Sequence, residues 1–215
     1  MNKKELTENT IEIAGKTALS VIPVGGALIT CVWDAVKGNA AQKRLNDWKE
    51  KVEERLSTLE LSLEEIGNNE IFTSTIIKAT DVAIKTMEVK KREYLANAVL
   101  NSVETSMEES EVMMYLDMMD RYTAWHLKIL CYFQNPKAFP GVDENNYLMG
   151  SPLQPMYKVF PELESNNSLV NKIVADLYND GMLNTSSMNA TMTGNGMVAS
   201  RTTDLGNKFI GFITN

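Results

Sequence analysis

The spacing of apolar and polar positions along the chain predicts a mainly α protein. Across residues 40–66 the apolar side chains recur at alternating steps of three and four, which is typical of a long amphipathic helix with a coiled-coil-like seam. An apolar stripe that runs over about three heptads must be covered by other parts of the chain or by another chain. We therefore expect self-association through this seam, or packing against the chain's own helices. The oligomer seam consists of Leu45, Trp48, Val52, Leu56, Leu59, Leu63 and Ile66.

Helical spacing continues after the seam, in residues 71–87, 89–103, 107–120 and 123–133. The run from Gly67 to Asn69 ends the long helix. Ser106 and Glu109 have the form of a capping box that opens the helix at 107–120. Together with the long helix, these segments predict a helical bundle over residues 37–122.

The seventeen residues from Thr17 to Trp33 carry no charge. As a helix they would extend about 25 Å, short of the roughly 30 Å hydrocarbon core of a bilayer. A helix breaker lies in their middle, and because proline removes a helical donor and glycine admits positive φ, residues 1–36 predict an apolar helical hairpin. The hairpin can pack in a bundle or insert into a membrane; we favour a buried resting state with conditional membrane engagement. Its turn consists of Pro23, Val24, Gly25 and Gly26.

The pattern changes in residues 123–215. Five of the six prolines fall between residues 136 and 161, which predicts an extended Pro-rich insertion over 134–161. A helix then ends at Gly181, and two short strands at 182–185 and 198–202 precede a final helix at 203–213. This order is that of the second half of a winged-helix domain. We therefore expect a small winged-helix-like α+β module whose contacts with a partner include Asn171, Lys172 and Arg201.

Charge restricts the class of partner. The 215 residues carry a formal net charge of −7, which argues against a protein that binds nucleic acid through its overall field. From residue 161 onward, five acidic residues outnumber three basic ones. We expect weak binding to duplex DNA and favour protein contact for the winged-helix-like module.

Candidate chemistry adds little. Two cysteines, Cys31 and Cys131, are too few for a disulfide framework or a zinc site, and such low cysteine use favours the reducing cytoplasm. The apolar hairpin adds conditional attachment to the inner face of the plasma membrane. His126 stands alone in an amphipathic helix, where a hydrogen-bonded structural role is the usual one. Acid–base or covalent catalysis needs an organised set of groups. We find no such set, and expect no enzyme activity, cofactor, metal or small-molecule substrate.

A resemblance to a known family is carried by four short runs, residues 91–98, 123–130, 177–183 and 203–209. In their order they resemble the layout of small bacterial helical proteins of the abortive-infection alpha type. The run from Ile22 to Leu28, before a long charged helix, is similar to hairpins that open uncharacterised bacterial proteins found near phage-defence genes. The resemblance implies a bacterial stress or defence context and transfers no catalytic residue.

We therefore expect a non-enzymatic helical interaction or effector protein of a bacterial defence or stress pathway. It would act by self-association or by binding a protein partner, with conditional membrane engagement. The alternative is a winged-helix DNA-binding transcriptional regulator.

Overall fold

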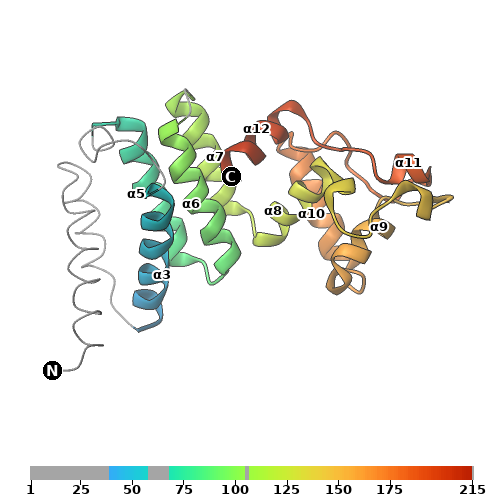
Figure 1. Ribbon diagram of the computed structural model, residues 1–215, viewed down its shortest axis with the longest axis horizontal. Coiled ribbons are helices and arrows are strands. Elements are labelled where there is room, and N and C mark those ends of the chain that lie inside the picture. The colour runs from blue at the N-terminus through green and yellow to red at the C-terminus, as the bar shows by residue number, and fades with distance from the viewer. Residues whose placement is uncertain (1–38, 58–67, 105–106, 215) are drawn as a thin grey trace. The chain divides into compact units, whose positions relative to one another are not determined.

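The computed structural model describes residues 39–57, 68–104 and 107–214, and they are mainly helical. They form two compact units (Figure 1). The first unit comprises the described residues up to Arg121 together with residues 212–214, and the second comprises Tyr122–Gly211.

The first unit is a helical bundle, as predicted. Helix α3 packs against α5 and α6, and α5 also packs against α6 and α7 (Figure 1). The core contains Trp48 of α3, whose indole Nε1 donates to Thr80 Oγ1 of α5 at 3.0 Å. The helices are α3 (Asn39–Leu56), α5 (Glu70–Lys85), α6 (Val89–Glu104) and α7 (Glu109–Arg121).

Side chains form hydrogen bonds with backbone groups at both ends of α5, and those at its C-terminal end come from neighbouring helices. Asn69, the expected stop signal of the preceding helix, is the N-cap of α5, and its side chain accepts from the Phe72 backbone N–H. At the other end, Arg44 of α3 donates to the Ile84 carbonyl, and Arg92 of α6 donates to the Thr86 carbonyl. The two guanidinium groups lie where the helix dipole is negative, so they stabilise the helix as well as its position.

The second unit contains short helices and one small sheet. Strand β1 (Met149–Gly150) pairs with β2 (Met192–Thr193) in antiparallel register. The last two residues of α12 count with the first unit. The α-helices are α8 (Ala124–Gln134), α9 (Leu153–Val159), α10 (Asn167–Asn179), α11 (Gly194–Met197) and α12 (Asp204–Ile213); the 3-10 helices are η1 (Pro136–Ala138), η2 (Glu144–Asn146) and η3 (Pro161–Leu163).

Two expectations for this unit are wrong. The Pro-rich insertion at 134–161 is folded, because Pro136 and Pro161 each begin a 3-10 helix, where a missing N–H costs nothing. The two strands expected at 182–185 and 198–202 reduce to a single bridge between Leu183 and Thr202. The expected helices α10 and α12 are confirmed, and Gly181 takes the positive φ of +75° expected after a helix end.

Candidate functional site

The hairpin and part of the seam lie outside the described residues. The candidate site residues that lie outside are Pro23, Val24, Gly25, Gly26, Leu59, Leu63 and Ile66.

The seam residues of α3 pack within the first unit. Leu45, Trp48 and Val52 are buried, and Leu56 is half-buried. The chain's own helices therefore cover the described part of the seam, which is the second of the two outcomes left open by the sequence. Self-association stays a prediction, and it must use other surfaces than these buried side chains.

The three residues expected to be contacts of a winged-helix-like module have different environments. Asn171 and Lys172 are exposed on α10, and the Lys172 ammonium pairs with Asp176 one turn later. The guanidinium of Arg201 is turned inward: it donates to the Gly196 carbonyl at 2.5 Å and lies 2.8 Å from Met192 Sδ. A contact of these residues with a partner stays a prediction.

A polar site on α6 holds the residues that follow Gly211. Asn97 Nδ2 donates to the Ile213 carbonyl at 3.1 Å, while Asn97 Oδ1 accepts from Arg55 Nε of α3 at 2.7 Å. Asn101 Nδ2 donates to the carbonyls of Phe212 and Thr214, each at 2.9 Å. Arg55 can only donate and a carbonyl can only accept, so the two contacts fix the orientation of the Asn97 amide.

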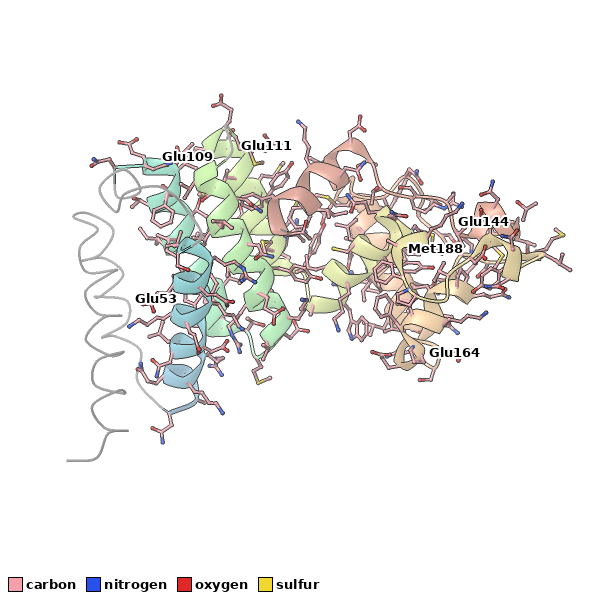
Figure 2. All side chains as sticks on the ribbon, in the orientation of Figure 1. Glu53, Glu109, Glu111, Glu144, Glu164 and Met188 are labelled. Atoms are coloured by element: carbon pink, nitrogen blue, oxygen red, sulfur yellow. The ribbon has the colours of Figure 1, made fainter. Side chains whose placement is uncertain are left out.

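An aromatic contact completes this site. The ring of Tyr115 on α7 lies 5.5 Å from that of Phe212, and both side chains are buried. The Tyr115 hydroxyl donates to Glu111, which Figure 2 labels, at 2.8 Å. Burial raises the pKa of Tyr115, and the bond to Glu111 raises it further, so the phenol stays neutral. We call Arg55, Asn97, Asn101 and Tyr115 the α6 seat.

Sequence reasoning missed the α6 seat. A weak signal was present, because Asn97 and Asn101 lie four residues apart within an apolar helical period. Asparagine has a low helix propensity, so two on one face of a helix interior indicate a tertiary partner. Their acceptors lie more than a hundred residues later, which no local pattern can indicate.

The one histidine of the chain joins α8 to α10. His126 Nδ1 accepts from the Thr123 backbone N–H at 3.2 Å, and Nε2 lies 3.3 Å from Asp176 Oδ2. The ring stacks on Tyr122, whose hydroxyl donates to Asp180 at 2.7 Å. Lys172, with a smaller contribution from His126, holds the pKa of Asp176 below its ordinary value. The cluster caps α8 and attaches it to α10, which is a structural task.

Two large apolar side chains are exposed where strand β1 of the small sheet begins. Leu148 is 92% exposed and Met149 is 69% exposed; we call this pair the apolar tip. The Gly194 N–H donates to the Leu148 carbonyl at 3.2 Å. A Cβ at Gly194 would overlap the carbonyl oxygens of Glu144 and Tyr147, so only glycine permits α11 to approach η2 this closely (Glu144 lies beside α11 in Figure 2). The backbone below the tip is thus closely packed.

Two further kinds of site do not occur in residues 39–57, 68–104 and 107–214. Within these ranges no three His, Cys, Asp or Glu side chains are grouped so that they could hold a metal ion. Across the same part of the chain, no helix has the length and apolar character needed to cross a bilayer.

Comparisons with models of known protein families, with curated proteins and with solved structures find no match to this chain.

Proposed function

We propose that this protein is a non-enzymatic helical interaction protein that acts by self-association, and that its copies meet through the apolar tip. The observation that carries the proposal is the exposure of Leu148 and Met149, next to each other in sequence and both extended into solvent. Single exposed apolar residues are common, whereas adjacent ones on a supported protrusion are typical of contact surfaces.

The energetics of the tip favour a contact. Burying a leucine or methionine side chain contributes about 1.5–3 kcal/mol relative to exposure. The backbone of the tip is already fixed by β1, β2 and the close approach at Gly194, so association costs little ordering of the chain. Two copies related by a two-fold axis would contribute the same tip, and the contact would be self-complementary.

Light scattering on a concentration series tests this proposal. Changing Leu148→Ser together with Met149→Ser should shift the association to concentrations at least about tenfold higher, since 1.4 kcal/mol already corresponds to a factor of ten. Met87→Ser is the matched control, because Met87 is 82% exposed in the first unit and not part of the tip. An equal effect of the control, or none of the tip variant, would contradict the role of the tip.

The second candidate is a winged-helix DNA-binding regulator. The order α9, η3, α10 is that of a helix–turn–helix, and α10 exposes Asn171 and Lys172. The basic residues do not favour this candidate, because Lys172 is already paired with Asp176 and Arg201 already bonds the Gly196 carbonyl within the unit. Gel-shift titration at physiological salt distinguishes the two candidates: sequence-selective submicromolar binding would favour the regulator.

Because the chain resembles abortive-infection alpha proteins, we propose that it acts in a bacterial defence or stress pathway. Membrane engagement through Thr17–Trp33 is a conditional part of the same proposal. Flotation of the protein with anionic liposomes tests it, with Gly26→Asp as the variant that should abolish flotation, since a charge near the bilayer centre costs at least about 2.5 kcal/mol.

A further inference from the structure

The α6 seat binds the backbone carbonyls of residues 212–214. Three consecutive carbonyls, those of Phe212, Ile213 and Thr214, each accept from an asparagine amide of α6. The last carbonyls of a helix have no partner within the helix, so these amides satisfy acceptors that would otherwise need water. Carbonyls are common to every residue type, and the recognition is therefore of backbone at a helix end.

Two side chains add selectivity to the seat. Phe212 and Ile213 are buried, and the Phe212 ring packs on Tyr115 at a centroid distance of 5.5 Å. The occupant is thus a short continuous segment with an aromatic and a β-branched anchor. Its contacts involve few residues, and they are the same for any copy of residues 212–214 that reaches the seat.

Packing requires glycine at only one of the two glycine positions of α12. A Cβ at Gly206 would overlap the Met182 carbonyl oxygen, so packing requires glycine there. A Cβ at Gly211 would meet nothing within 4 Å, so packing does not require it. Glycine in a helix costs about 1 kcal/mol relative to alanine. Gly211 is also the last residue of the second unit, directly before the segment that the seat holds. It weakens the helix at that point.

We propose that the α6 seat also accepts residues 212–214 of a second copy of this chain, so that two copies associate by exchanging this segment. The exchanged segment makes the same contacts as the chain's own, and such exchange is a low-cost route to a dimer. A helix weakened at Gly211 allows the segment to leave its own seat. The inference rests on the proposed self-association and adds to the apolar tip a second contact between copies, which does not involve the tip.

A mixing experiment with two full-length variants tests the exchange. The donor carries Asn97→Asp and Asn101→Asp, which replace the donating amides by carboxylates that repel carbonyl oxygens, so its own segment is released. The acceptor carries Phe212→Asp and Ile213→Asp, so its own segment cannot enter a buried seat. With different affinity tags, donor and acceptor should co-purify at least about tenfold more than donor with donor or acceptor with acceptor. Co-purification no greater than that of the like pairs would overturn the exchange.

A peptide measurement keeps the proposal testable if the donor folds poorly. A labelled peptide of residues 208–215 should give a saturable rise in fluorescence anisotropy with the acceptor, and the same peptide with Phe212→Asp should not. Equal signals from the two peptides would overturn the exchange.

The outcomes separate the exchange from the proposed function. Adding Leu148→Ser and Met149→Ser to both donor and acceptor should leave their co-purification in place. Loss of co-purification in this background would assign the association to the apolar tip and overturn the exchange. If the tip variant weakens association of the wild-type protein while donor and acceptor co-purify no more than the like pairs, the proposed function stands and the exchange fails. A wild-type protein that keeps the mass of one chain at every concentration would overturn both.

Discussion

The change Asn97→Leu should destabilise the first unit by about 2 kcal/mol. The Asn97 side chain is only 8% exposed and is bonded on both sides, to Arg55 and to the Ile213 carbonyl. Leucine has the same number of side-chain heavy atoms and the same branching at Cγ, so the change removes the hydrogen bonds without leaving a cavity.

The magnitude follows from the two lost bonds. A buried carbonyl left without a donor costs about 1–3 kcal/mol, and Ile213 is fully buried. The bond from Arg55 is worth about 1 kcal/mol, below the roughly 1.5–3 kcal/mol of a buried charged donor, because a quarter of the arginine side chain is exposed to water. Burial of the leucine side chain returns about 1 kcal/mol. The net loss is about 1–3 kcal/mol.

Urea denaturation followed by Trp48 fluorescence measures this change. Replacing Trp33 and Trp125 by phenylalanine in both proteins leaves Trp48, buried in α3, as the reporter of the first unit. Asn46→Leu is the matched control, since Asn46 is exposed on α3 and should stay within about 0.5 kcal/mol of wild type. The reasoning is refuted if Asn97→Leu also stays within that range.

Two further predictions concern a buried charge and a pair of glycines. Lys91 is 6% exposed and donates to the Asp120 carbonyl, and burial lowers its pKa below the ordinary 10.5. Lys91→Met should therefore leave stability unchanged or raise it by up to about 1 kcal/mol at pH 7. The advantage should shrink as the pH rises towards 10.5 in urea titrations, because the folded wild type loses this proton before the unfolded chain does and so gains stability; an advantage that grows with pH would contradict this. Gly194→Ala should lower the melting temperature in circular dichroism, because the added methyl overlaps the Glu144 carbonyl, whereas Gly211→Ala should raise it; the same sign for both would contradict the packing argument.

Local signals in the sequence predicted most of the described helices, although the helix expected over residues 40–66 ends at Leu56. Gly181 occupies its expected position after the end of α10, because it acts through its own backbone geometry. Asn69 was expected to end a helix, but it caps the start of α5 through its side chain. Apolar periodicity likewise placed Trp48 on the buried face of α3. Whether its cover came from the same chain or another was open, since periodicity identifies a face and not its partner.

Pairings between distant residues could not be predicted in the same way. Strand β2 pairs with β1, from the Pro-rich insertion, and not with its neighbours in sequence, because the close approach at Gly194 brings these segments together. The α6 seat depends on Asn97 and Ile213, which are 116 residues apart. Each asparagine gave a weak local signal, and only the folded chain shows its acceptor.

The most direct test of self-association is the mass of the wild-type protein in light scattering, measured over a wide concentration range. The account predicts a mass that rises from one chain, 24.0 kDa, towards twice that value as concentration increases. A mass that stays at 24.0 kDa throughout the range would contradict it.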